Sequence, residues 1–396
     1  MLSGHDIVYF GNDWHADNRT SSHHVADILR RTNRVLYVEV SGARAPRAAA
    51  RDLRRVATKL VKLFQRPREV SDRFYVQSLL LVPFRRWPLV AALNRVLALG
   101  TIRRSMRILG MKAPISWILT PEAGFVAGHL GEKLVVHFCH DDYANMPRVD
   151  YDSMWRLHRQ LIDRADVLIA VSQSLAERIA VDGKPILVSP HGVDVRHFGL
   201  AMSPDTPIPS DAAHLRRPIV IFIGLVEEWV DTGLLAHIAR SRPDWTLLIV
   251  GRVAVSDRSW MELPNVHCLG PRPYAELPGY LKAAQVAIMP YHINQQTLHS
   301  NPLKLREYLA AGLPVVSVPV PEVERYSPPV LLGRDPQHFV SCIQQALDQD
   351  TPEQRQARFG RVANESWEQR VERLSAFTEQ ILAEVEGREN IECRRA

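Results

Sequence analysis

The sequence has few cysteines and no long apolar run. Its four cysteines are spread over 396 residues, with no two close enough to form a metal knuckle, at Cys139, Cys268, Cys342 and Cys393. A disulfide scaffold is therefore excluded, and a protein of the reducing cytoplasm is expected. No apolar run reaches the roughly 18 residues that span a bilayer, and the N-terminus enters a strand pattern directly, without the features of a signal peptide.

The familiar motifs of α/β enzymes are also missing. No G-x-G-x-x-G follows a strand pattern and no Walker A sequence occurs, which argues against dinucleotide-binding oxidoreductases and P-loop nucleotidases. The absence of H-E-x-x-H and G-x-S-x-G disfavours metallopeptidases and α/β-hydrolases. No matching set of zinc ligands accompanies His140. We therefore expect neither a cofactor nor a bound metal.

The sequence instead alternates short apolar runs with helical patterns, which predicts a parallel α/β architecture. In the first half, strands are expected at residues 6–10, 34–40, 73–82, 115–119, 133–138, 166–171 and 186–188. In the second half they are expected at 219–224, 246–250, 285–290 and 314–318, and more weakly near 266–268 and 329–332. One intervening helix is expected to open with the capping box Ser174-x-x-Glu177.

A chain of 396 residues is too long for one core and predicts two domains. Four prolines with little periodicity occur between residues 199 and 218, which marks an interdomain linker. We expect one Rossmann-like domain over 1–198, a linker over 199–217, a second such domain over 218–365 and a packing helix over 366–390. A cleft between the two domains is the natural binding site.

The positive charge is concentrated in one segment. The net charge is +6, yet residues 44–112 hold 17 basic and only 3 acidic residues. Residues 44–70 predict a basic amphipathic helix, and residues 85–104 repeat the pattern with Trp87 as an interfacial anchor. An anionic membrane surface is the expected partner, with a solvated basic face as the alternative. Nucleic acid is not expected, because few aromatic residues are interleaved for base stacking.

A lysine and a glutamate stand at the start of a predicted helix in residues 301–319. Asn301 is expected as the N-cap and Pro302 as the first helical residue. Lys304 and Glu307 then share one face of the helix. One interpretation is a surface ion pair, worth about a few tenths of a kcal/mol. The other is a phosphate site, in which Lys304 adds its charge to the free N–H groups and Glu307 accepts hydrogen bonds from sugar hydroxyls.

The segment HDD follows a strand pattern, so it is expected at the carboxyl end of that strand, where α/β folds bind ligands. Asp142 and Asp141 are candidates for a general base that takes the proton of a substrate hydroxyl. An Asx turn or a cap of the next helix is the alternative. His140 is a candidate for orienting a neighbouring group or the substrate.

The loop after the first strand, residues 11–24, is polar and contains one tryptophan. It is expected to cap the following helix at Ser21 or Ser22. A tryptophan among hydrogen-bonding side chains suits sugar stacking, whereas the alternative is a loop that only packs on its own helix. The candidates for binding the sugar substrate are Asp13, Trp14, His15, Asn18 and Arg19.

The segment SNPLKLREYLAAGLPVVS resembles the donor-site signature of GT-B glycosyltransferases, especially a bacterial exopolysaccharide and teichuronic-acid branch. Further resemblances to that branch, or to the wider group, cover both halves of the chain in NDWHADNRTSSHHVADILRR, HFCHDDY, PHGVDVRHF and FIGLVEEWVDTGLLAHIARSRPDWTLLIVG. The resemblance implies two Rossmann-like domains facing a cleft, with the acceptor in the first and the nucleotide sugar in the second. It also implies that Lys304 meets the diphosphate and Glu307 the ribose. The implied donor-binding residues are Gly224, Asn301, Pro302, Leu303, Lys304 and Glu307.

The chain departs from the wider pattern at two points. Retaining members carry a second glutamate upstream of Glu307, where this chain has His299. The residue after Gly224 is usually basic, but here the sequence continues as LVEEWVD. The xanthan-assembly glucuronosyltransferase, a more distant resemblance, also lacks that upstream glutamate and is inverting. Both stereochemical outcomes therefore stay open.

The resemblance implies a metal-independent glycosyltransferase that uses a UDP- or GDP-sugar. The acceptor would be a hydroxyl of a lipid-linked glycan at the inner face of the cell membrane, in polysaccharide biosynthesis. A nucleotide-sugar epimerase of the same fold is one alternative, since it needs a donor but no acceptor. An inactive membrane-bound scaffold of a polysaccharide assembly complex is the other.

Overall fold

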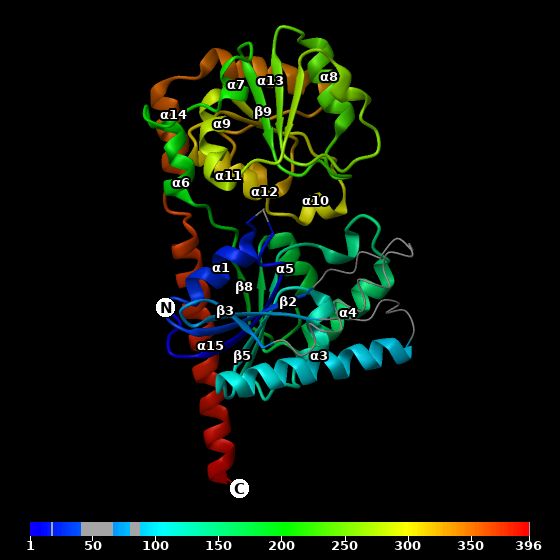
Figure 1. Cartoon of the computed structure of the whole chain (residues 1–396), viewed down its shortest axis with the longest axis vertical. Coiled ribbons are helices and arrows are strands. Elements are labelled where there is room, and N and C mark those ends of the chain that lie inside the picture. The colour runs from blue at the N-terminus through cyan, green and yellow to red at the C-terminus, as the bar shows by residue number, and fades with distance from the viewer. Residues whose placement is uncertain (17–18, 41–65, 80–87, 396) are drawn as a thin grey trace. The chain divides into compact units, whose positions relative to one another are not determined.

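The computed structural model describes residues 1–16, 19–40, 66–79 and 88–395 (Figure 1). They form two compact units, which we call unit 1 (Met1–Ser189 with Val371–Ala396) and unit 2 (Pro190–Arg370). The chain leaves unit 1 once and returns to it, so unit 2 is an insertion ahead of the last helix. None of the helices among these described residues is both long enough and apolar enough to cross a bilayer.

Unit 1 is built on an eight-stranded sheet with the strand order β3-β4-β2-β1-β5-β6-β7-β8. Neighbouring strands are parallel, except that β3 is antiparallel to β4. The strands are β1 (Asp6–Gly11), β2 (Arg34–Glu39), β3 (Arg68–Ser71), β4 (Phe74–Ser78), β5 (Ile115–Ile118), β6 (Leu134–Cys139), β7 (Val167–Ala170) and β8 (Ile186–Val188). The helices are α1 (Ser21–Leu29), α3 (Pro88–Leu109), α4 (Tyr151–Arg164) and α5 (Gln173–Ile179), with short 3-10 helices η1 (Pro121–Val126) and η2 (Tyr143–Asn145).

Unit 2 contains a six-stranded parallel sheet in the order β11-β10-β9-β12-β13-β14. Its strands are β9 (Ile219–Ile223), β10 (Thr246–Val250), β11 (Val266–Gly270), β12 (Val286–Met289), β13 (Val315–Ser317) and β14 (Leu331–Leu332). Its helices are α6 (Val195–Gly199), α7 (Ser210–Ala213), α8 (Thr232–Ser241), α9 (Leu277–Ala283), α10 (Gln295–His299), α11 (Leu303–Ala310), α12 (Pro321–Glu324), α13 (Pro336–Gln349) and α14 (Pro352–Val362). Three 3-10 helices are η3 (Leu200–Met202), η4 (Ser259–Glu262) and η5 (Tyr274–Glu276), and α15 (Trp367–Arg395) runs from unit 2 back into unit 1.

The central strands are buried along their whole length, which explains why the sequence shows them as unbroken apolar runs. β6 (LVVHFC) and β9 (IVIFI) are buried at every residue. Parallel sheets with both faces covered require such strands. The expected pair of doubly wound parallel sheets is confirmed.

In each sheet the strand order reverses beside the first strand of the unit, between β1 and β5 in unit 1 and between β9 and β12 in unit 2. Doubly wound folds bind ligands outside the carboxyl ends of the strands at such points. The loop that holds Trp14 follows β1, and Gly224 follows β9. The segment HDD follows β6, the second strand from β1.

Residues 199–217, predicted as a linker, instead belong to unit 2 and contain η3 and α7. Three of their carbonyl groups accept hydrogen bonds from Nζ of Lys282 in α9, at 2.8, 2.7 and 2.7 Å. This contact fixes a proline-rich stretch that lacks periodicity of its own. The expected basic helix over 44–70 lies mostly outside the described residues, and its last residues form the edge strand β3, which the sequence did not predict.

Two predicted helix caps in unit 1 are wrong. Ser172, and not Ser174, caps α5, and its hydroxyl accepts a hydrogen bond from the N–H of Leu175 at 3.2 Å. Neither Ser21 nor Ser22 caps α1, because the helix follows Thr20. The hydroxyl of Ser22 instead forms a buried hydrogen bond with the Tyr37 hydroxyl, at 2.8 Å.

Candidate active site

Lys304 and Glu307 form an ion pair one helical turn apart on α11. Nζ of Lys304 donates to Oε2 of Glu307 at 2.6 Å, and the two side chains are 25% and 12% exposed. Both lie in the first turns of α11, where the N–H groups of the first four residues have no partners within the helix. The sequence prediction that the two residues share a face is therefore confirmed by their contact.

Two glycines bring backbone close to this pair. Gly224 follows β9 with φ +156°, and a Cβ at this position would lie 3.9 Å from Cε of Lys304. Gly251 follows the neighbouring strand β10, and its Cβ would lie only 1.9 Å from the carbonyl oxygen of Gly224. No side chain fits at Gly251, because the Gly224 backbone occupies that space, and glycine at position 224 keeps a further side chain away from Lys304. Gly251 was not predicted as a site residue, although a glycine directly after a buried strand was the available signal.

Tyr308 fixes the end of β9 against α11. Its buried hydroxyl accepts a hydrogen bond from the N–H of Ile223 at 2.8 Å and lies 3.3 Å from the carbonyl oxygen of the same residue. Burial, followed by the charge of nearby Glu307, raises the pKa of Tyr291 above its ordinary value. Burial likewise raises the pKa of Tyr308, so Tyr291 and Tyr308 both stay neutral near Glu307.

Asn301 does not cap α11 as predicted. The helix begins at Leu303, and Pro302 takes the N-cap position without a side-chain hydrogen bond. The Asn301 amide is used elsewhere: its Oδ1 accepts from the His191 N–H at 3.1 Å and from Arg306 at 2.8 Å. Its Nδ2 donates to Glu322 at 2.6 Å. Asn301 thus anchors the segment that precedes the helix.

Arg306 is the centre of a buried ionic network that sequence reasoning missed. Its side chain is 1% exposed and pairs with Glu365 at 2.6 Å. Glu365 also accepts from Tyr326 at 2.8 and 2.9 Å and pairs with Arg370 at 2.9 Å. Arg306 and Glu365 are 59 residues apart in the chain, so no local spacing reveals their contact. The network holds the start of α11 in position.

In unit 1, the two aspartates of HDD lie in different environments. Asp142 is 1% exposed, and its Oδ2 lies 3.3 Å from Nε of Arg178 and 2.7 Å from Nδ2 of Asn145. Asp141 is only half buried, and its Oδ1 accepts from the N–H of Asp142 at 2.9 Å. Arg178 lies over the Trp155 ring at 4.6 Å. Asp142 is therefore engaged in a structural pair, whereas Asp141 stays accessible.

His140 packs edge-on against Phe138, with ring centroids 4.7 Å apart. Burial, with a smaller contribution from His137, lowers the pKa of His140 to about 3. The ring is consequently neutral at physiological pH. A neutral imidazole orients a neighbour by hydrogen bonding without adding a charge.

The loop after β1 is ordered by its tryptophan. The Trp14 ring packs on Phe74 at 4.4 Å and on Tyr37 at 5.1 Å, and the backbone N–H of Trp14 donates to Oε1 of Glu39 at 2.9 Å. Asp13 forms an Asx turn by accepting from the N–H of His15 at 2.9 Å. Asp13, His15 and Arg19 are exposed, Trp14 is half buried, and Asn18 lies outside the described residues. The loop is therefore held by the packing of Trp14, while the polar side chains of Asp13, His15 and Arg19 remain exposed.

The comparisons with known proteins cover both units. Residues 4–197 match the family model described as Glycosyltransferase Family 4, and residues 217–349 match that described as Glycosyl transferases group 1. Each family model matches most of one unit. A Bacillus subtilis (strain 168) protein, named for a role as a teichuronic acid biosynthesis glycosyltransferase, TuaH, is 30% identical over 208 residues. That match covers 49% of this chain and 51% of the relative, so it spans about half the length of the relative.

Solved structures resemble this chain in fold over nearly its whole length. Sucrose-phosphate synthase from Thermosynechococcus elongatus has a TM-score of 0.71 and 15% identity, covering 96% of this chain and all of that one (100%). An E. coli trehalose-6-phosphate structure bound with UDP-2-fluoro glucose has a TM-score of 0.65 and 11% identity, covering 95% and 99%. Anabaena HepE, in complex with UDP and glucose, has a TM-score of 0.64 and 15% identity, covering 96% and 100%. The predicted GT-B fold is confirmed.

Proposed function

We propose that this protein transfers a sugar from a UDP- or GDP-sugar to a hydroxyl of a membrane-associated, lipid-linked glycan. The observation that carries the proposal is the Lys304–Glu307 pair, held at 2.6 Å on the first turns of α11 beside Gly224. A lysine next to free helical N–H groups suits a diphosphate, and a carboxylate beside it suits ribose hydroxyls.

The comparisons support this choice of substrates. Two of the similar structures, those with the UDP-2-fluoro glucose and with UDP and glucose, hold a uridine nucleotide. The relative named for teichuronic acid biosynthesis supports a polysaccharide product. A uridine-linked donor is accordingly the first to test, with GDP-sugars as the second.

In the proposed reaction, the acceptor hydroxyl loses its proton to a carboxylate of the HDD segment. We place Asp141 in that role, because Asp142 is buried against Arg178 at 3.3 Å. The departing diphosphate gains negative charge as its bond to the sugar breaks. The charge of Lys304 and the N-terminus of α11 stabilise it there, so the transfer is proposed to need no metal.

The donor site makes one direct prediction. Lys304→Ala is expected to weaken UDP binding about 10- to 150-fold, since a charge-assisted hydrogen bond is worth about 1.5–3 kcal/mol. Glu307→Gln should weaken binding of both UDP and UMP, because its proposed partner is the ribose. Isothermal titration calorimetry on both variants measures the effect, with the thermal midpoint as a check on folding.

The matched control is Arg334→Ala, which removes an exposed cation that follows β14, three strands from β9. It should bind UDP like the wild type. If Lys304→Ala and Glu307→Gln also bind UDP normally, the pair is a surface ion pair and the proposed donor site is wrong.

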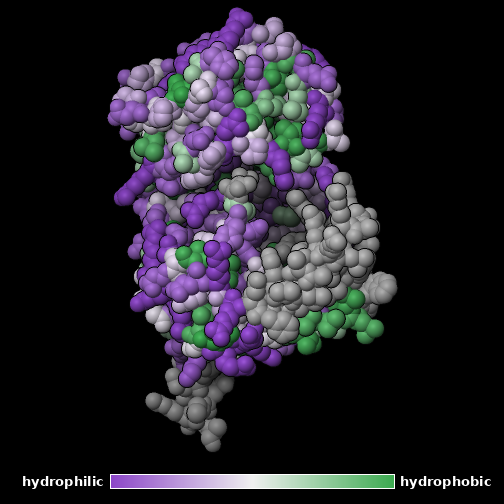
Figure 2. Space-filling model, in the orientation of Figure 1, coloured by the Kyte–Doolittle hydropathy of each residue, from purple (hydrophilic) through white to green (hydrophobic). Residues whose placement is uncertain are grey.

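The membrane part of the proposal is supported by α3. Leu89, Leu93 and Val96 are 86%, 48% and 68% exposed and recur at positions that share one face of the helix. Figure 2 shows hydrophobic residues gathered over this end of α3. Arg103, Arg104 and Arg107 are exposed farther along the helix. An apolar stripe that continues into cations suits the surface of an anionic bilayer, which we propose at the inner face of the cell membrane.

The double variant Leu89→Ser/Leu93→Ser is expected to weaken sedimentation with anionic liposomes at least about 10-fold, because burying one leucine contributes about 1.5–3 kcal/mol. Binding should also weaken with salt, as screening of the arginines increases. Leu200→Ser is the control, because it removes a similarly exposed leucine from unit 2. Wild-type protein that stays in the supernatant at low salt would rule out the membrane surface.

A further inference from the structure

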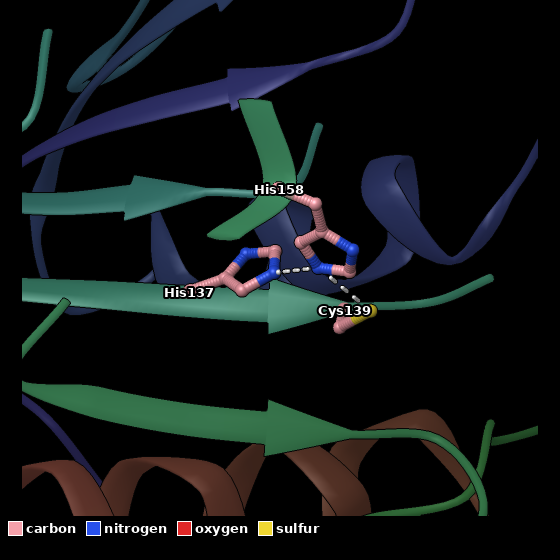
Figure 3. A group of neighbouring side chains, drawn as sticks. All are labelled: His137, Cys139 and His158. Carbon is pink, nitrogen blue, oxygen red and sulfur yellow. Dashed lines mark hydrogen bonds between the residues drawn. The ribbon is translucent and has the colours of Figure 1, made fainter. Parts of the chain in front are cut away.

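Two histidines and a cysteine that the proposed transfer does not use meet inside unit 1. His137 and Cys139 lie on β6 and His158 on α4 (Figure 3). All three are buried, and one nitrogen or sulfur atom of each lies within 4.8 Å of the others. Nε2 of His158 is 2.9 Å from Nε2 of His137 and 3.7 Å from Sγ of Cys139. Three donor atoms therefore converge on one point.

The local structure explains this convergence. His137 and Cys139 are two residues apart on a strand, so both point to the same face of the sheet. α4 packs on η1, η2 and β6, which brings His158 over that face. The sequence signal, H-x-C on a strand and a histidine on the next long helix, was too dispersed for a recognised metal spacing.

A hydrogen bond at Nδ1 of the His137 ring leaves Nε2 of that ring available as a metal ligand. Its Nδ1 lies 3.0 Å from the carbonyl oxygen of Ile118, and a carbonyl can only accept, so Nδ1 carries the hydrogen. Nε2 then presents its lone pair to the cluster. A ring N–H held by a backbone carbonyl, with the other nitrogen free to ligate, is typical of metal-binding histidines.

Without a cation, the cluster is imperfectly satisfied. The single hydrogen that Nε2 of His158 can carry is approached by both His137 and Cys139, as the two dashed lines in Figure 3 show. One hydrogen cannot make two good bonds of this kind. Nδ1 of His158 is buried and finds no hydrogen-bond partner among the described residues. An unsatisfied buried polar atom costs about 1–3 kcal/mol.

We propose that His137, Cys139 and His158 bind one d10 cation, Zn²⁺ or Cu⁺. Two imidazoles and a thiolate are borderline-to-soft ligands that suit these ions and not Mg²⁺ or Ca²⁺. Bond lengths of about 2.0–2.1 Å to nitrogen and 2.3 Å to sulfur require the ligand atoms to be about 3.3–3.6 Å apart. The observed separations of 2.9 and 3.7 Å lie within about half an ångström of these values, and the third pair, His137 with Cys139, lies within 4.8 Å.

Binding requires a proton to leave. The Cys139 thiol loses its hydrogen to solvent as the metal–sulfur bond forms, while both histidines ligate as neutral rings. The hydrogen bond between Nδ1 of His137 and the Ile118 carbonyl leaves the lone pair of Nε2 of His137 available to the ion. The carbonyl oxygen of Asp141, which accepts a hydrogen bond from the Cys139 thiol at 3.5 Å, is the oxygen that we propose for a fourth position. The ion would join α4 to β6 directly before HDD.

The test uses the full chain, prepared without a polyhistidine tag and stripped of metal. Zn²⁺ is titrated against a chromogenic chelator, and Cu⁺ against bicinchoninate under anaerobic, reducing conditions. About one equivalent of one ion should bind with submicromolar Kd and raise the thermal midpoint. X-ray absorption of the loaded protein should show two nitrogen ligands and one sulfur. Comparing the two titrations identifies the ion that the site binds, Zn²⁺ or Cu⁺.

Cys139→Ser and His158→Gln should each abolish this equivalent, and Cys268→Ser, which changes a half-buried thiol in unit 2, should keep it. The proposal is overturned if the stripped wild type binds neither ion stoichiometrically, or if the absorption spectrum lacks sulfur. It is also overturned if Cys139→Ser binds as well as the wild type. Should both variants fail to fold, the wild-type titration and spectrum decide the question alone.

Discussion

Asparagine in place of Asp141 is expected to lower the rate of sugar transfer about 10²- to 10⁴-fold, the usual contribution of a general base. UDP binding and the thermal midpoint should stay at wild-type values. The physical reason is that the carboxylate is needed only when the acceptor hydroxyl gives up its proton. The half-buried Asp141 side chain has the access that this role requires. Single-turnover kinetics with a radiolabelled donor separates the chemical step from donor binding.

Asp142→Asn provides the comparison. It removes the negative partner of Arg178, whose side chain is 22% exposed, so it should lower the thermal midpoint as well as transfer. The assignment fails if Asp141→Asn transfers normally. A stable Asp142→Asn variant that is inactive would move the base to Asp142.

Glu365→Gln is expected to lower the free energy of unfolding by about 3–5 kcal/mol, the usual cost of removing one partner from a buried ion pair. Arg306, at 1% exposure, and Arg370, at 16%, would both remain in the core without their anion. Urea denaturation followed by tryptophan fluorescence measures the loss. Glu368→Gln removes an exposed carboxylate nearby and should change stability by less than about 0.5 kcal/mol.

The same network predicts a pH dependence. Burial by itself raises the pKa of Glu365, but the charge of Arg306, hydrogen bonds from Tyr326 and Arg306, and the charge of Arg370 outweigh it, so the pKa lies below its ordinary value. The stabilisation that the Glu365 carboxylate gives the folded protein is therefore complete above its unfolded-state pKa of about 4.3. It is lost as the pH falls through the lower pKa that Glu365 has in the folded state. The stability difference between wild type and Glu365→Gln should shrink over that acidic range. A difference that grows with acidity would contradict the network.

Much of the fold was predictable because its strongest signals are local. Buried parallel strands such as β9 must be apolar throughout, so composition alone revealed them. The sequence did not predict β3, because its residues are mostly exposed and it pairs at the edge of the sheet. A polar edge strand carries no distinctive pattern.

The same distinction applies to the candidate site. Lys304 and Glu307 are one turn apart, so helical geometry was enough to predict their contact. Asn301 was wrongly predicted as the N-cap of α11, because its amide oxygen binds Arg306 and its amide nitrogen binds Glu322. Glu322 is 21 residues away in the chain, so local sequence gives no sign of this contact. Arg178 and Asp142 are likewise joined only by the tertiary fold. Sequence spacing predicts partners within a helix or strand and does not reveal those that packing brings together.

The insertion of unit 2 ahead of α15 sets an order for synthesis on the ribosome. Residues 190–370 form unit 2 from one continuous stretch, so it can complete its core while the end of the chain is still being made. Unit 1 has to wait, because Val371, Leu374 and Ile381 of α15 belong to it and are buried. The domain that is translated first is thus the last to be finished. Until then its incomplete surface stays exposed, which makes this interval the stage at which a nascent chain is most dependent on chaperones.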